Sequence, residues 1–197
     1  MSLVFKPLKP GLMEDFGEVL RGSWGVGCWC MFPRLTSGQT RALPGRGSLN
    51  DRRRRAMTKL SRRRRAPGLL AYEDGQAVGW IAIAPRTELG RIEASRATPR
   101  VDDVDVWVIP CVTVRKSERG RGIALGLIRA AVAYAARHGA PAVEAYPRAG
   151  SARTHDDNAY FGTEPLFRRA GFRVVRKELK KLPGNRVARV TMRVKVV

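Results

Sequence analysis

The sequence predicts one domain of the mixed α/β (α+β) class that contains antiparallel strand pairs. The apolar runs Leu69–Glu73 and Ala77–Ala84 flank Asp74-Gly75, which is a strong signal for a β-hairpin. A second strand pair is predicted around Pro183-Gly184-Asn185. Between them, the apolar run Val106–Val114 precedes two glycines and a helical run, which indicates a strand–loop–helix unit.

The N-terminal third is predicted to hold one strand and two helices. Apolar residues recur at helical spacing in the first helix, and a polar cap and a Pro-Gly pair bound the second. The segments are a strand at Val4–Pro7, a helix at Met13–Arg21, an irregular stretch at Gly22–Pro33, a polar loop at Leu35–Gly47, and a helix from Ser48, Asn50 or Asp51 to about Arg65.

The rest of the chain is predicted to alternate strands and helices. Pro110 lacks an N–H group, so its strand should be an edge, carry a bulge or separate locally from a neighbour. The segments are a charged connection at Pro85–Val104, a strand at Val106–Val114, a helix at Arg121–His138, a strand at Ala142–Tyr146, a polar loop at Pro147–Asn158, a helix at Tyr160–Ala170, and strands at Phe172–Glu178 and Arg186–Val196.

Composition limits the class of protein. The 197 residues, 44% of them apolar, suffice for one core, and residues 1–197 are expected to form one domain. No run approaches the roughly 18 apolar residues of a membrane span, and Met1–Pro10 lacks a signal core, so we expect a cytoplasmic protein without a membrane partner. Cys28 and Cys30 have no nearby histidine, which favours ordinary thiols over a metal site.

The net charge of +21 attracts polyanions, whether nucleic acid, acidic membrane or a multiply charged cofactor. Arg52–Arg55 and Arg62–Arg65 contribute eight of these charges and start ten residues apart, so on one helix both runs could face the same way. A solvated helix that touches the core through Ala56, Met57 and Leu60 is favoured over a nucleic-acid surface.

The two glycines after Val114 suggest an anion site. A tight turn at a helix N-terminus points backbone N–H groups at open space, where a phosphate can bind. A Walker A loop is excluded because no Gly-Lys-Ser/Thr follows. A Rossmann loop fits poorly, since Leu125 occupies the place of its third glycine and Gly126 comes one residue late.

Two motifs carry a family resemblance. Arg119, Gly122 and Ala124 fill the defined positions of [QR]-x-x-G-x-[GA], and Leu166–Phe172 is similar to L-Y-x-x-x-G-F. The chain therefore resembles the GNAT superfamily of N-acetyltransferases, strongly over Val106–Val175 and more loosely from Ala66 to Arg86. It is most similar to bacterial members of unknown substrate that carry a Cys-Trp-Cys-Met segment, here residues 28–31.

The resemblance implies a mixed, mostly antiparallel sheet of six or seven strands, splayed between strands four and five and flanked by about four helices. It implies acetyl-CoA as co-substrate, with no metal. The pantetheine arm would lie along the splayed strand and the pyrophosphate on the glycine loop, while Lys116 could add charge. The implied contacts are Cys111, Val112, Thr113 and Val114 on the strand, and Arg119, Gly120, Arg121, Gly122, Ile123 and Ala124 on the loop.

The implied reaction is direct attack of a primary amine on acetyl-CoA in a ternary complex, with a small-molecule amine as the expected acceptor and a homodimer allowed. A backbone N–H near Val112 or Val114 would stabilise the oxyanion. Phe167 stands where the family has its tyrosine acid, so Tyr160 and Tyr146 are candidate proton donors, unless both merely pack at the core edge.

Glu144 is the candidate general base. Strand alternation puts Ala142, Glu144 and Tyr146 on one face, so the carboxylate is either functional or paired with an arginine. His155, with Asp156 and Asp157, is a less favoured base in the following loop. Two alternatives to an enzyme stay open on the same fold without turnover: a basic nucleic-acid-binding protein and a CoA-binding regulatory protein.

Overall fold

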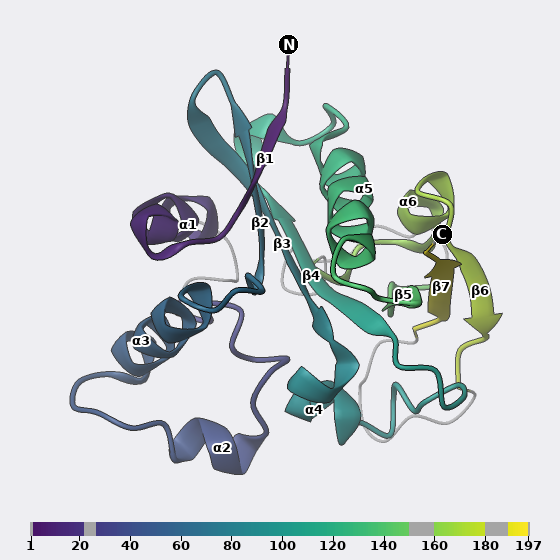
Figure 1. The fold of residues 1–197 in the computed structure, drawn as a ribbon, viewed down its shortest axis with the longest axis horizontal. Coiled ribbons are helices and arrows are strands. Elements are labelled where there is room, and N and C mark those ends of the chain that lie inside the picture. Colours follow the sequence, from purple (N-terminus) through teal and green to yellow (C-terminus); the bar gives the residue numbers. More distant parts are fainter. Residues whose placement is uncertain (1, 22–26, 150–159, 180–188, 197) are drawn as a thin grey trace.

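The computed structural model describes residues 2–21, 27–149, 160–179 and 189–196. Seven strands form one sheet in the order β1-β2-β3-β4-β5-β7-β6 (Figure 1). Every neighbouring pair is antiparallel except β4 with β5, which confirms the predicted fold class. The strands are β1 (Val4–Pro7), β2 (Gly68–Glu73), β3 (Gln76–Pro85), β4 (Trp107–Val114), β5 (Ala142–Ala145), β6 (Arg173–Arg176) and β7 (Thr191–Lys195).

Helices cover both faces of the sheet (Figure 1). On one side lie α1 (Met13–Leu20) and α3 (Leu49–Ser61), and on the other α5 (Ile123–Ala136) and α6 (Glu164–Arg169). Two short helices, α2 (Ser37–Arg41) and α4 (Gly90–Glu93), lie in the connections.

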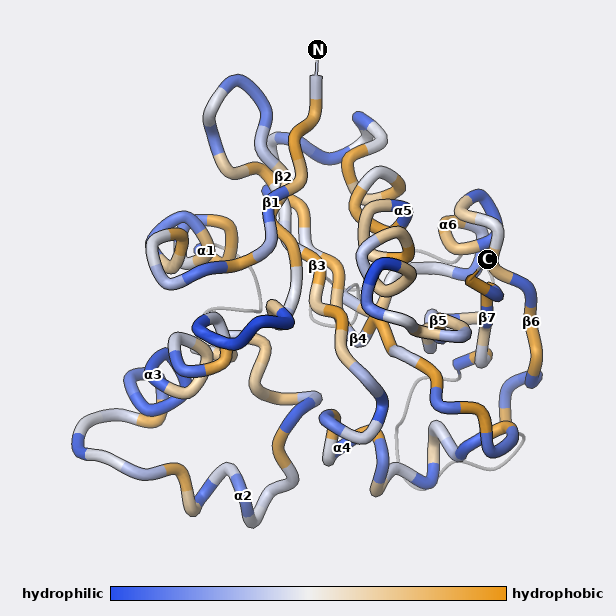
Figure 2. Tube along the Cα trace, viewed as in Figure 1, coloured by the Kyte–Doolittle hydropathy of each residue, from blue (hydrophilic) through white to orange (hydrophobic). Residues whose placement is uncertain are grey.

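The main apolar clusters lie against the two faces of the sheet. Leu127, Ile128 and Phe167 belong to the cluster beneath α5 and α6, whereas Phe16 and Trp80 belong to the one beneath α1 and α3. Burying a large apolar side chain contributes about 1.5–3 kcal/mol. Hydrophobic residues accordingly follow the central strands and α5, whereas the turn after α3 is strongly hydrophilic (Figure 2).

β4 carries the bulge and the separation that Pro110 predicts. Ala82 of β3 pairs with Cys111, but Ala84 pairs with Val108, so β4 contains one extra residue between these pairs. Parallel pairing with β5 ends at Ile109. The two strands then diverge, and no described strand pairs with residues 111–114 on that side.

Several predicted boundaries were wrong for local reasons. The second helix ends at Ser61, so the two arginine runs do not share one helix face. The backbone N–H of Ala66 does not continue the helix and instead donates a hydrogen bond to Tyr134 Oη at 2.7 Å. Pro67 also disfavours helical backbone at the residue before it.

The expected loop at Leu35–Gly47 contains α2, which Thr36 caps together with Gln39. The predicted connection at Pro85–Val104 contains α4. The last helix begins at Glu164 rather than Tyr160, because Gly162 has a φ of +71° and interrupts the helical path.

Candidate functional site

The end of β4 offers free backbone groups toward the gap. The Arg115 N–H donates to Val78 O of β3 at 3.0 Å. Backbone direction alternates along an antiparallel strand, so the N–H groups of Val112 and Val114 face away from β3. The Val114 carbonyl also points away from β3 and accepts a hydrogen bond from Arg119 Nε at 3.4 Å. The two N–H groups that were predicted as oxyanion donors therefore point to the side of β4 on which no described strand pairs with it.

The glycine loop opens directly onto the N-terminus of α5. Gly120 and Gly122 have φ values of +83° and +82°, which favour glycine over other residues. Gly122 is the N-cap, no described side chain makes a capping hydrogen bond, and the first turn of the helix contains no acidic residue. A methyl group at either glycine would meet nothing within 4 Å. The first turn of α5 thus has N–H groups without a side-chain cap at the positive end of the helix dipole, the arrangement that suits a phosphate.

The cations of the loop are partly neutralised. Arg121 Nη1 forms an ion pair with Glu73 at 2.8 Å and also pairs with Glu118. Lys116 lies in a short 3₁₀ turn just before the loop. Backbone N–H groups are therefore the main structural support for an anion at this loop, ahead of the Arg121 side chain.

A small cavity lies beside the unpaired end of β4. Cys111 and Thr113 of β4 line it together with Tyr160, and α1 and the segment after it supply the remaining wall. Those remaining residues are Leu20, Cys28, Cys30, Phe32 and Pro33. No sequence pattern predicts that Cys28 and Cys30 share a cavity with Cys111, because the three cysteines come from distant segments.

The thiols in this cavity form a buried chain of contacts. Trp80 Nε1 donates to Cys30 Sγ at 2.9 Å, and Cys30 Sγ lies 3.7 Å from Cys111 Sγ. The hydrogen bond to Cys111 and burial raise the pKa of Cys30, while burial raises that of Cys28. No group of three described His, Cys, Asp or Glu residues is arranged to hold a metal ion.

Tyr160 and Phe167 occupy different environments. Tyr160 is half-buried at the cavity, and burial raises the pKa of its hydroxyl, so the proton is retained at neutral pH. Phe167 is fully buried, with its ring centroid 5.1 Å from that of Phe172. The position of the family's tyrosine is thus a core position in this chain, and Tyr160 is the phenol next to Cys111.

Glu144 lies in a buried polar network. Its Oε1 accepts from Arg193 Nη2 at 2.7 Å and Nε at 3.0 Å, and its Oε2 lies 3.8 Å from Arg86 Nη1. The Tyr146 hydroxyl donates to Oε2 at 2.8 Å and itself accepts from Arg86. The geometry matches the arginine-paired alternative for Glu144, although neither Arg86 nor Arg193 was singled out from the sequence.

The predicted site residues therefore fall into two groups. Tyr160 packs with the cluster beneath α1 and α3, next to the open end of β4. Tyr146 instead belongs to a third cluster with Leu89 and Ile92, near α4, and burial raises its pKa. The alternative base His155, with Asp156 and Asp157, lies outside the described residues.

Comparison with known proteins gives a family and a fold. A sequence model of the Acetyltransferase (GNAT) family matches residues 33–160, whereas no curated protein matches the chain. Within the described ranges, no helix has the length and apolar character needed to span a bilayer.

The fold is similar to several solved acetyltransferases. Arylalkylamine N-acetyltransferase 2 from Aedes aegypti is 13% identical with a TM-score of 0.61, and the match covers 100% of both chains. The ribosomal-protein-S18-alanine N-acetyltransferase from Escherichia coli is 10% identical with a TM-score of 0.55, over 99% of this chain and 94% of that one. The PaiA N-acetyltransferase from Thermoplasma acidophilum, in complex with coenzyme A, is 14% identical with a TM-score of 0.52, over 99% of each chain. The family match covers well over half of the sequence, so this chain belongs to the GNAT family of acetyltransferases.

Proposed function

We propose that this protein transfers an acetyl group from acetyl-CoA to the primary amine of a small molecule, by direct attack in a ternary complex. The observation that carries the proposal is the open half of β4 beside the uncapped N-terminus of α5. The strand offers the N–H groups of Val112 and Val114, and the loop offers those of its glycine turn. The pantetheine arm of acetyl-CoA can pair with the strand as an added strand would, and its pyrophosphate can bind the N–H groups of the loop.

In this mechanism the pantetheine amides pair with residues 111–114, and the pyrophosphate binds Arg119, Gly120, Arg121, Gly122, Ile123 and Ala124. The N–H of Val112 or Val114 stabilises the oxyanion that forms when the amine attacks the thioester. Tyr160 protonates the departing thiolate, since this residue lines the cavity with Cys111 and its hydroxyl retains its proton at neutral pH.

The network of Glu144 and Tyr146 has a supporting role in this proposal. Two arginines hold the carboxylate, which fixes β5 and the start of the following loop at the edge of the gap. Glu144 acts as the base only if the acceptor reaches this network, and Tyr146 then completes its proton path through the hydrogen bond to Oε2.

Similar folds act on different amines, as the names of an arylalkylamine enzyme and a ribosomal-protein alanine enzyme indicate. The test therefore begins with the acyl donor, acetyl-CoA. Isothermal titration of the full chain with acetyl-CoA should show binding at one site, and chromatography should detect free CoA when an amine panel is added. An absence of binding at millimolar acetyl-CoA would contradict the proposal, and binding without turnover on any amine would favour a regulatory CoA-binding protein.

A further inference from the structure

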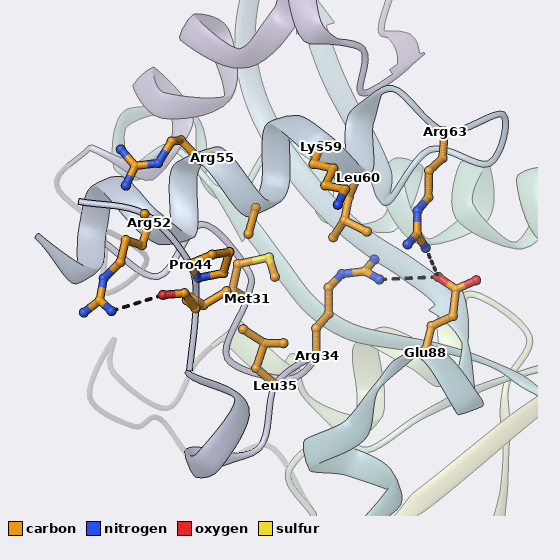
Figure 3. Close-up of a pocket in the computed structure, with 13 residues that line it drawn as sticks. Met31, Arg34, Leu35, Pro44, Arg52, Arg55, Lys59, Leu60, Arg63 and Glu88 are labelled. Carbon is orange, nitrogen blue, oxygen red and sulfur yellow. Dashed lines mark hydrogen bonds and ion pairs between the residues drawn. The ribbon is translucent and has the colours of Figure 1, made fainter. Parts of the chain in front are cut away.

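A large cavity lies between α3 and the chain segment before it (Figure 3). Its volume of about 660 Å³ falls within the roughly 300–1,000 Å³ of small-molecule sites. Met31 and Leu35 line it, whereas the neighbouring Phe32 and Pro33 line the cavity beside Cys111. The two cavities therefore lie on different sides of one segment, and the larger one contains none of the proposed acetyl-CoA contacts.

One stripe of α3 forms a wall of this cavity. Arg52, Arg55, Ala56, Lys59 and Leu60 recur at helical spacing, so they share a face. The other two arginines of the run point elsewhere: Arg53 donates to Gly27 O at 3.1 Å, and Arg54 pairs with Glu14. Half of this arginine run thus faces a cavity, whereas the sequence predicts a solvated helix that touches the core only through Ala56, Met57 and Leu60.

The lining combines an apolar wall with an excess of positive charge. Figure 3 shows cationic side chains at both ends of the cavity and apolar side chains between them. Among the described residues that line it, Glu88 alone is acidic. The apolar members are Met31, Leu35, Leu43, Pro44, Ala56 and Leu60, and the cations are Arg34, Arg52, Arg55, Lys59 and Arg63.

Arg34 carries a buried positive charge that is balanced only by a carboxylate shared with other arginines. Its side chain is 4% exposed, and its Nη1 lies 3.8 Å from Glu88 Oε2. Arg63 at 3.7 Å and Arg65 at 3.5 Å share the same carboxylate, so three guanidinium groups surround one negative charge. Burial lowers the pKa of Arg34 to about 10. A buried charge is costly unless it is paired, so a further anion would be stabilised here.

Two guanidinium groups of the lining also have unused donors. Among the described residues, the buried Nε atoms of Arg34 and Arg52 have no hydrogen-bond partner. Each side chain is held by a backbone carbonyl: Arg34 Nη2 donates to Pro67 O at 3.0 Å, and Arg52 Nη1 to Leu43 O at 3.2 Å. The cations are therefore positioned by the fold but remain able to bind an anion after small side-chain adjustments.

We propose that this cavity binds a small amphipathic carboxylate, with its hydrocarbon body on the apolar wall and its carboxylate paired with the arginines. The apolar surface selects against simple inorganic anions, and the charge excess selects against neutral or cationic molecules of the same shape. The site is additional to the proposed acetyl transfer.

The test uses octanoate, octanamide and octylamine, which share a hydrocarbon chain and differ in head-group charge. Isothermal titration of the full chain at constant ionic strength should show one octanoate site, with octanamide bound at least about tenfold more weakly and octylamine unable to compete with octanoate. Saturating CoA should leave octanoate binding unchanged. Displacement by CoA, or equal affinity for octanoate and octanamide, would overturn the proposal.

Two variants locate the site. Leu43→Glu places a carboxylate in the lining, where it should compete for the arginines and weaken octanoate binding about tenfold. Val175→Glu makes the same change at an exposed position on β6, so it has the same net charge and should bind octanoate as the original protein does. Equal weakening in both variants would show that octanoate responds only to the net charge, and unchanged binding in Leu43→Glu would exclude this cavity.

Discussion

Cys30 and Cys111 lie 81 residues apart in the sequence, yet their Sγ atoms are 3.7 Å apart beside the open end of β4. Both thiols are buried, and Cys28 is less so. Since a thiolate is the reactive form, burial and a raised pKa should make Cys28 and Cys30 slow to alkylate, whereas the hydrogen bond from Cys30 lowers the pKa of Cys111 and only burial protects that thiol. We expect iodoacetamide at pH 7.5 to label Cys28 first and to reach Cys30 and Cys111 mainly after unfolding, as peptide mass spectrometry can show. Rapid labelling of Cys111 in the native protein would contradict this arrangement.

Gly122 should be needed for ligand binding as well as for backbone geometry. Gly122→Ala forces a non-glycine residue into a φ of +82°, at a cost of about 1–2 kcal/mol. Gly139→Ala is a matched control, because Gly139 has a φ of +77° after the other end of α5 and likewise has open space around it. We expect similar losses of stability in urea unfolding, but an affinity for acetyl-CoA about tenfold lower only in Gly122→Ala. Equal affinities would argue against the loop as the phosphate site.

Tyr160→Phe tests the proposed acid. Removing the hydroxyl should lower kcat about 100-fold, with little change in the Kd for acetyl-CoA, because proton transfer is lost and the cavity wall stays in place. Tyr146→Phe removes a buried hydroxyl that is bonded to Glu144, so its main effect should be on stability. Steady-state kinetics and urea unfolding of both variants separate the two roles. A large kcat loss in Tyr146→Phe alone would assign the acid to Tyr146 instead.

Local signals predicted most of the sheet. The Asp74-Gly75 hairpin forms with both residues at positive φ, and Pro110 marks the bulge and the separation of β4 from β5. The end of α3 could not be predicted from local sequence, because the Ala66 N–H donates its hydrogen bond to the hydroxyl of Tyr134, which lies on a helix distant in the sequence. The position of β7 between β5 and β6 likewise depends on contacts between distant segments, which no local sequence pattern specifies.

In the candidate site too, features carried by consecutive residues could be predicted from the sequence, whereas contacts between distant segments could not. The glycine loop could be predicted because its chemistry lies in consecutive backbone groups. Glu144 could be recognised as a carboxylate in a strand, but its partners Arg86 and Arg193 come from segments 58 and 49 residues away, so the sequence left its role open. The cavity along α3 was not predicted, because its walls come from segments that only the fold brings together.

Acid should weaken the contact between Asp102 and Arg193, which is a bidentate pair with distances of 2.7 and 2.8 Å. The hydrogen bonds from Arg193 hold the pKa of Asp102 below its ordinary value. A lowered folded pKa contributes stability above the unfolded pKa of about 3.9, and this contribution is lost as pH falls through the folded value. Urea unfolding between pH 6 and pH 3 should therefore show a shallower decline for Asp102→Asn than for the original protein. Asp103→Asn, with the same change in net charge, should keep the original slope, and an identical slope in all three proteins would refute the linkage.

Glu144→Gln distinguishes a structural carboxylate from a catalytic base. The carboxylate is 1% exposed and pairs with Arg193 and Arg86, so its neutralisation removes a buried counter-charge and leaves Arg193 with Asp102 and Arg86 with Glu93. We expect the free energy of unfolding to fall by about 3–5 kcal/mol. Glu18→Gln, which breaks a pair with Arg21 at a 41% exposed side chain, should cost about 1 kcal/mol or less. Urea unfolding measures both. If Glu144→Gln is as stable as Glu18→Gln but its kcat/KM falls 100-fold or more, the carboxylate is the base and the arginines hold it in position for that role.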